Sequence, residues 1–197
     1  MIQYLLPVFG LGMWAAAPQL TVRLDPEGGG CRLIVRNDHT VAATAYTVEG
    51  ESRGERWSET HEQTGAAGGL APYAEAVVRR VDCSSKPTRT AAVYADGSAI
   101  GEPELVTEII EGRRARLANT RELIRRIESA RKQRKSNQQI SDEIDRWATT
   151  EGHQTYATWE EIRGRMKQKS LDQLLQDLRQ RERWLASSKP SLESPRP

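Results

Sequence analysis

The sequence predicts a small antiparallel β-sandwich followed by an α-helical hairpin or a three-helix region. Three observations support this fold class. Apolar and polar residues alternate as far as Ile100, apolar residues then recur every three or four positions, and a turn-forming stretch separates the two patterns. Alternation is typical of half-buried strands, and the longer repeat is typical of amphipathic helices. We therefore expect a strand half and a helix half in one chain.

The strand half extends from Gln19 to Ile100. Its alternating runs are QLTVRL (19–24), CRLIVR (31–36), VAATAYTV (41–48), AEAVVRRVDC (74–83) and RTAAVYA (89–95). The stretches between them are rich in turn-forming residues. Several short strands at such spacing predict an antiparallel sandwich. The segment WSETHEQT (57–64) is read as one more strand, and the glycine-rich GAAGG after it as a mobile loop.

The boundary between the two halves falls near Gly101. Asp96-Gly97 lies between two apolar runs, and this dipeptide is favoured in hairpin turns that require positive φ. Pro103 then supplies a φ suited to the first turn of a helix, with an acidic residue on either side at the positive end of the helix dipole. A helix is therefore expected to leave the sandwich directly from its last hairpin.

The helical half contains several apolar stripes. The first stripe consists of Val106, Ile110, Arg113, Leu117, Thr120, Ile124 and Ile127. Its steps of four and three are heptad-like, but two polar members favour an amphipathic helix over a strict coiled coil. KSNQQ (135–139) ends this helix, and a short one follows. The last helix begins at a capping box formed by Thr158 and Glu161, or starts afresh where Ser170 and Gln173 form another.

These stripes must meet each other, the sandwich or a partner. The residues that we single out for contact with a partner helix, each with membership of the chain's own core as the alternative, are Ile110, Leu117, Ile124, Trp147, Trp159 and Leu178. The chain thus divides into a signal peptide (1–17), an immunoglobulin-like sandwich (18–101), a helical, coiled-coil-like region (102–186) and a disordered tail rich in Pro and Ser (187–197).

The N-terminal segment predicts export to the periplasm or the medium. It has no charge before Leu20, and its apolar stretch ends in Ala15-Ala16-Ala17, as in a secretory signal peptide. The signal is atypical, because it has no Lys or Arg and Pro18 would follow the cleavage site. The alternative is a buried first strand. No transmembrane span is expected in the mature chain.

The two cysteines, Cys31 and Cys83, are consistent with export. In an oxidising compartment they are predicted to form one disulfide that closes a long loop. In the cytosol they would remain two buried thiols. Their spacing does not match a redox or zinc motif.

The sequence favours a non-enzymatic protein with no cofactor or metal. It contains no G-x-S-x-G elbow, no H-E-x-x-H motif and no phosphate-binding loop. Ser98 is read as a turn residue, and His39, His61 and His153 as separate loop residues. The alternative is an envelope hydrolase with a loop-built site that uses His61, Glu62 and Asp38.

One basic cluster stands out in a chain of nearly balanced charge, formally +2. Its residues are Arg125, Arg126, Arg131, Lys132, Arg134 and Lys135. They lie at a helix C-terminus, where cations are favoured by the dipole, so a solvated helix face is the preferred interpretation. The alternative is contact with an anionic polymer or anionic lipid. Nucleic acid is disfavoured, because dedicated binders are strongly basic.

Two longer runs, CRLIVRNDHTVAATAYTVEG (31–50) and AAVYADGSAIGEPELVTEIIEGRRARL (91–117), give the chain a family resemblance. Together with the leader, they resemble an uncharacterised group of exported bacterial proteins. The resemblance implies an immunoglobulin-like sandwich and an exported location, and it implies no activity. We therefore expect an exported structural or protein-interaction protein, whose partner is a second copy or another envelope protein.

Overall fold

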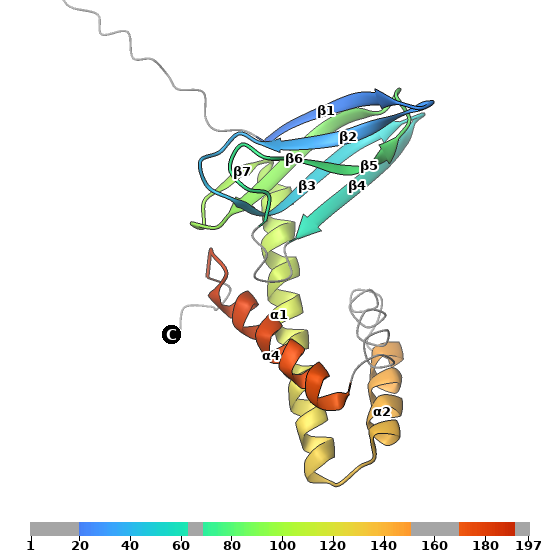
Figure 1. Cartoon of the computed structure of the whole chain (residues 1–197), viewed down its shortest axis with the longest axis vertical. Helices are drawn as coiled ribbons and strands as arrows, with labels where there is room; N and C mark the ends of the chain where they lie inside the picture. The colour runs from blue at the N-terminus through green and yellow to red at the C-terminus, as the bar shows by residue number, and fades with distance from the viewer. Residues whose placement is uncertain (1–19, 63–68, 151–169, 192–197) are drawn as a thin grey trace, which may run out of the picture.

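The computed structural model describes residues 20–62, 69–150 and 170–191, with the side chains of 147–150 excepted. Its strands are β1 (Leu20–Glu27), β2 (Gly30–Asn37), β3 (Ala43–Ser52), β4 (Glu55–Glu62), β5 (Glu75–Val81), β6 (Lys86–Tyr94) and β7 (Ala99–Gly101). The helices are α1 (Pro103–Lys132), α2 (Asn137–Thr150) and α4 (Leu171–Ser187). Two antiparallel sheets form one end of the molecule, and the helices extend from it (Figure 1).

The sheets have the orders β1-β2-β5 and β4-β3-β6-β7. Their facing sides enclose a core that includes Leu33, Val35, Val48 and Tyr94. The five alternating runs of the sequence each form a strand, and the 57–64 segment contributes β4. The expected sandwich of antiparallel strands is thus present. The segment predicted as a mobile glycine-rich loop falls mostly outside the described residues.

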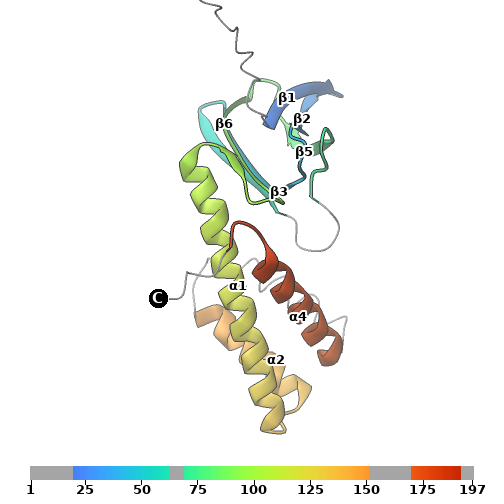
Figure 2. The ribbon, with the colours of Figure 1, turned by 90° about the vertical axis from the view of Figure 1, so that its left-hand side faces the viewer.

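The four-stranded sheet is buried on both faces where β6 ends. Ala92 and Tyr94 of β6 face the other sheet, whereas Ala91 and Val93 pack against Leu105 and other residues in the first turns of α1. Figure 2 shows this sheet between α1 and the three-stranded sheet. The double covering explains why β6 ends in an uninterrupted run of small and apolar residues, as is typical of strands buried on both sides.

The hairpin between β6 and β7 connects the sheet to the helices. Gly97 has a φ of +95°, and its N–H donates to the Tyr94 carbonyl at 3.0 Å. Asp96 does not have positive φ, so the hairpin has a three-residue loop with glycine in the left-handed position, in place of a two-residue turn. The Glu102 N–H still donates to β6, at the Thr90 carbonyl, before Pro103 begins α1. The helix therefore starts against the sheet without a linker.

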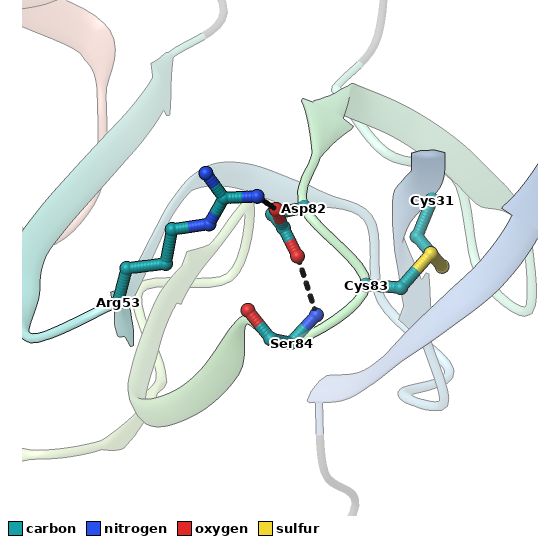
Figure 3. Close-up of a disulfide and its surroundings, with 5 residues drawn as sticks. All are labelled: Cys31, Arg53, Asp82, Cys83 and Ser84. Carbon is teal, nitrogen blue, oxygen red and sulfur yellow. Dashed lines mark hydrogen bonds and ion pairs between the residues drawn. A yellow bond between two sulfur atoms is a disulfide. The ribbon is translucent and has the colours of Figure 1, made fainter. Parts of the chain in front are cut away.

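The predicted disulfide joins Cys31 and Cys83, with a Cα–Cα distance of 5.0 Å (Figure 3). The neighbouring Asp82 accepts a hydrogen bond from the Ser84 N–H at 2.9 Å and forms an ion pair with Arg53, at the tip of the β3–β4 hairpin. The bond therefore attaches the end of β5 to the start of β2, and the ion pair attaches the same point to the opposite sheet.

The helices form a second core of their own. Leu123 and Ile127 of α1 pack with Ile140 of α2 and Leu174 of α4, among others. Both shorter described helices begin at a capping box. In each, the serine hydroxyl oxygen accepts from the glutamine backbone N–H, and the glutamine side-chain oxygen accepts from the serine backbone N–H. The residues are Ser136 and Gln139 for α2, and Ser170 and Gln173 for α4. The predicted start at Ser170 is thus confirmed, whereas the one at Thr158 lies outside the described residues.

Candidate functional site

A buried ion pair joins the sandwich to the helices. Arg113 of α1 has a fully buried side chain, and its Nε donates to Glu62 Oε1 at the end of β4 at 2.7 Å. Its Nη2 donates to Thr44 Oγ1 at 2.9 Å, and its Nη1 donates to the Lys189 carbonyl at 3.3 Å. Arg116 pairs with the second oxygen of Glu62. We call Arg113, Glu62, Thr44, Arg116 and Lys189 the junction.

Burial lowers the pKa of the Arg113 guanidinium to about 10, which still leaves it cationic at neutral pH. A buried charge is tolerated only when it is paired and its hydrogen bonds are satisfied. Glu62 supplies the opposite charge and is itself only 6% exposed. Trp184 of α4 lies beside the guanidinium, 5.9 Å from its carbon to the ring centroid. The junction therefore fixes β3, β4, α1 and the end of α4 relative to each other.

The segment after α4 returns to the sandwich. A Cβ placed on Gly97 would lie 3.0 Å from the Cβ of Lys189, so the tip of the β6–β7 hairpin is packed against this segment. Lys189 falls within 187–197, the stretch predicted as a disordered tail. Its backbone carbonyl accepts a hydrogen bond from Arg113. Residues 192–197 lie outside the described part.

At the other end of α1, a cleft of about 620 Å³ lies between α1 and α2. Its apolar lining is formed by Ile127, Ala130, Ile140 and Ile144, all of which belong to the helical core. Its charged lining consists of Arg125, Arg126, Lys135, Arg146 and Glu143. We call this site the basic cleft. Among the residues that the structure describes, its lining has four cationic side chains and one anionic one.

Two acidic residues orient three of the four cations of the basic cleft. Arg125 donates to both carboxylate oxygens of Glu122, at 2.7 and 2.6 Å, and Arg126 Nε donates to one of them at 2.7 Å. These hydrogen bonds lower the pKa of Glu122 to about 2. Glu143 of α2 pairs with Lys135 across the cleft. These pairs pre-organise the lining.

A second cleft, also of about 620 Å³, lies between α1 and α4. Its charged lining is balanced: Glu128, Asp172 and Glu182 oppose Arg131, Arg179 and Arg183. Two pairs cross it, Arg131 with Asp172 and Arg179 with Glu128, at 2.5 and 2.6 Å. We call this the neutral cleft. Its ion pairs hold the two helices together.

The predicted basic cluster is thus divided by the structure. Arg125, Arg126 and Lys135 line the basic cleft, and Arg131 lines the neutral cleft. Lys132 and Arg134 are exposed at the end of α1 and line neither cleft.

The residues singled out for a partner helix lie mainly in the chain's own core. Leu117, Ile124 and Leu178 are buried, and Ile110 is half-buried where the sheet-facing and α4-facing clusters of α1 meet. Their apolar character is therefore accounted for by contacts within the chain. The side chain of Trp147 and the whole of Trp159 lie outside the described residues.

The residues of the hydrolase alternative do not converge on one described site. His61 stacks on Tyr46, with ring centroids 5.1 Å apart, whereas the next residue, Glu62, contacts α1 in the junction. Asp38 pairs with Arg36 at 2.8 Å. Consecutive residues of a strand point to opposite faces, which separates His61 from Glu62. His153 lies outside the described residues.

His39 and Ser98 have structural partners. His39 stacks on Tyr94, with centroids 4.2 Å apart, and its Nδ1 accepts from the Val41 N–H. Ser98 donates its hydroxyl to Asp96 at 2.6 Å and not to a histidine. Burial, followed by the charges of Asp38 and Asp96, raises the pKa of Tyr94 to about 12, so this phenol stays neutral. Within the described residues, no group of His, Cys, Asp or Glu is arranged to hold a metal ion.

The junction was not foreseen from the sequence. Arg113 and Thr120 were read as polar interruptions of the first stripe, yet both are buried. Thr120 satisfies its hydroxyl by donating to the Arg116 carbonyl at 2.7 Å. The only indication of the junction in the sequence is a charged residue, Arg113, at an apolar stripe position. Its burial is explained by Glu62, which is 51 positions away.

Comparison of the chain with family models, curated proteins and solved structures finds no match. Its function must therefore be inferred from its own residues. No helix in the described ranges is both long enough and apolar enough to cross a membrane.

Proposed function

We propose that this protein is a non-enzymatic, exported interaction protein in which a sandwich holds a helical arm in a fixed orientation. The observation that carries the proposal is the junction. Arg113 bonds to Glu62, Thr44 and the Lys189 carbonyl, so one buried side chain connects the sheet, α1 and the returning C-terminal segment. Leaving such a charge without its partner is strongly destabilising, which disfavours movement of the arm.

The arm presents its far end away from the sandwich. From Arg113 to Lys132, α1 continues for about 28 Å at the helical rise of about 1.5 Å per residue. Its apolar stripe along this length is covered by α2 and α4. The surface offered to a partner is therefore the polar exterior of the helical end, and the partner that we propose is a protein of the envelope or a second copy of the chain.

Export and an immunoglobulin-like sandwich belong to the same proposal. The disulfide supports export, because such bonds persist in oxidising compartments and are rare in the cytosol. The seven antiparallel strands of the described residues, arranged in two sheets, support an immunoglobulin-like arrangement. Residues 1–17 remain the proposed signal peptide.

The location is tested by the intact mass of the protein, produced with its own leader and recovered from separated cell fractions without reducing agent. We expect an exported chain that has lost about residues 1–17 and whose mass is two hydrogens below that of the reduced form. A full-length chain with free thiols in the cytosol would contradict the proposal.

The interaction is tested by placing a photo-reactive amino acid at single exposed positions in living cells. Gln138 of α2 and Gln180 of α4 sample the helical end, and the exposed Thr21 of β1 is the matched control on the sandwich. We expect protein adducts from the helical positions and none from Thr21. Adducts only from Thr21, or from no position, would mean that the arm is not the interacting part.

A further inference from the structure

We propose that His39 is an acid-sensitive latch on the loop between β2 and β3 (38–42): the neutral ring holds Val41, and the protonated ring releases Val41 and pairs with Asp96. The inference goes beyond the proposed function and does not rest on it, because all three residues belong to the sandwich. It depends on one hydrogen bond that only a neutral histidine can accept, on the other bonds of the loop, and on the charges around the ring.

The hydrogen bond from Val41 defines the protonation state of the ring. The Val41 N–H donates to Nδ1 of His39 at 2.9 Å, so Nδ1 carries no proton and the ring is neutral. Both nitrogens of a protonated histidine are donors, so no orientation of the charged ring can accept this bond. Histidine side chains change charge between about pH 5 and 8. The bond is therefore lost on mild acidification, whichever way the ring turns.

The other bonds that close the loop do not depend on a titratable group. The His39 N–H donates to Asn37 Oδ1 at 3.0 Å, and Asn37 Nδ2 donates to the Val41 carbonyl at 2.9 Å. Asn37 is completely buried and also donates to the carbonyls of Leu70 and Ala71, so its position does not depend on the charge of His39. Protonation therefore frees the Val41 N–H while the Val41 carbonyl stays held. The latch opens the loop at one point and leaves the sandwich folded.

The protonated ring has an acidic neighbour in the β6–β7 hairpin. The Ala95 N–H donates to the Ala42 carbonyl at 3.0 Å, so the loop and this hairpin lie side by side. Both hydrogen bonds from Ser98 go to Oδ1 of Asp96, and Oδ2 is the acceptor that we assign to the charged ring. The bonds from Ser98 and, to a smaller extent, the positive charge of His39 lower the pKa of Asp96. The ring and this carboxylate therefore attract each other when both are charged.

The remaining charges near the ring also bear on its protonation. Besides Asp96, the titratable or charged groups described there are Asp38, Arg36, Tyr94 and Lys189. Asp38 and Arg36 pair with each other at 2.8 Å, so their charges largely cancel. Tyr94 stacks on His39 and offers the charged ring an aromatic face. Lys189 lies beside the β6–β7 hairpin and is the opposing cation. Asp96 and the aromatic face thus favour the charged ring against one ammonium group.

The test is NMR spectroscopy of the purified, folded chain between about pH 8 and 5. The ring signals of His39 give the midpoint of its titration. Hydrogen exchange, corrected for the intrinsic rate at each pH, gives the protection of the Val41 amide. We expect this protection to fall about tenfold across the midpoint, the effect of losing one hydrogen bond. The Glu102 amide, which donates to the Thr90 carbonyl, is the internal control and should keep its protection.

Two substitutions of His39 give opposite expectations. His39→Asn places a side-chain oxygen where Nδ1 lies, and asparagine accepts from the N–H two residues on as an Asx turn does, at every pH. Val41 should then stay protected throughout. His39→Ala removes the acceptor and should leave Val41 unprotected throughout. A pH-dependent Val41 amide in either variant, or a pH-independent one in the unsubstituted chain, would overturn the latch.

Asp96→Asn tests the second partner of the ring. Asparagine keeps an oxygen for the bonds from Ser98 but does not attract the charged ring, so the midpoint of His39 should fall by about 0.5 pH unit or more. Glu55→Gln is the matched control, because the exposed Glu55 lies at the opposite end of β3, about 30 Å from the loop. It should leave the midpoint unchanged. An equal shift in both variants, or none in Asp96→Asn, would overturn the pairing with Asp96.

The amide spectrum of each variant verifies that it is folded. None of these measurements depends on export or on a protein partner, so the proposed function would stand or fall separately.

Discussion

Arginine has opposite surroundings at the two ends of α1. Near the sheet, Arg113 is completely buried and bonds to groups from β3, β4 and the segment after α4. Three to four turns later, Arg125 and Arg126 lie at the surface and bond to Glu122 of their own helix. The first arginine is expensive to disturb, because its charge has no access to water. Arg125 and Arg126 are accessible to water, which can replace Glu122 as a hydrogen-bond partner at little cost.

This difference distinguishes a charge that fixes the fold from charges that stay at the surface. The near end of α1 uses charge to fix one arrangement of the chain, because Arg113 bonds to groups from three other segments. The far end keeps Arg125, Arg126 and Lys135 partly exposed around a cleft, where they pair with nearby carboxylates. The same residue type therefore joins distant segments in one place and pairs within its own helix in the other, and burial decides between them.

Removal of the buried arginine is expected to give the largest effect. Arg113→Ala leaves Glu62 buried without its main partner and should lower the free energy of unfolding by about 3–5 kcal/mol. The measurement is urea denaturation followed by tryptophan fluorescence, since Trp184 lies beside the guanidinium. The exposed neighbour Arg114 is the control, and Arg114→Ala should change stability by less than about 0.5 kcal/mol. Similar effects of both changes would remove the contrast between the two ends.

Loss of the disulfide is expected to come second. Replacing both Cys31 and Cys83 by serine should cost about 2–4 kcal/mol, because the unfolded chain regains the freedom of a long closed loop. The loss should affect the sandwich and leave the distal helical core intact. Denaturation with and without reductant measures it, and the double variant, which has nothing to reduce, serves as the control. A wild-type chain unaffected by reductant would contradict the expectation.

A smaller effect is expected at the start of α4. Ser170→Ala removes one half of a capping box and should destabilise the helix by about 1 kcal/mol. Hydrogen exchange should show faster opening of the first turn of α4 and unchanged protection in β6. Ser58→Ala, at an exposed position of β4, is the matched control. Faster exchange throughout the chain would mean that the far end is not independent of the near end.

The smallest effect is expected at Glu122. Its pKa of about 2 lies below that of an unfolded glutamate, so its ion pairs stabilise the chain above about pH 4.3 and that contribution is lost as the pH falls toward 2. Because the group is near the surface, the contribution should be below about 1 kcal/mol. Denaturation between pH 2 and 6, compared with Glu122→Gln, measures it. A difference that persists below pH 2 would point to a cause other than charge.

The sequence was sufficient for features with local causes. The strands, the disulfide and the cap at Ser170 follow from alternation, cysteine placement and a four-residue motif, each of which acts over a short range or has few alternatives. The buried face of α1 was only partly predicted. Its first turns bury Leu105 and Ile109 against the sheet more deeply than Val106 and Ile110, which are half-buried against the same cluster.

The sites themselves depended on distant partners. Arg113 and Glu62 are 51 positions apart, and nothing near either residue indicates the other. The cations of the basic cleft were predicted as a cluster, but the sequence could not assign Arg131 to a different cleft from Arg126. That separation follows from helix geometry and from the way in which α2 and α4 pack on opposite parts of α1.

The junction also has a consequence for the order of folding. Its bonds link Arg113 to residues 51, 69 and 76 positions away, whereas the helical contacts within α1 are local. Contacts between distant parts of a chain form slowly, because a large loop must close first. The junction should therefore assemble after the sheet and the helix already exist. A late step of this kind acts mainly as a barrier to unfolding, so it would determine how long the folded molecule lasts more than how quickly it forms.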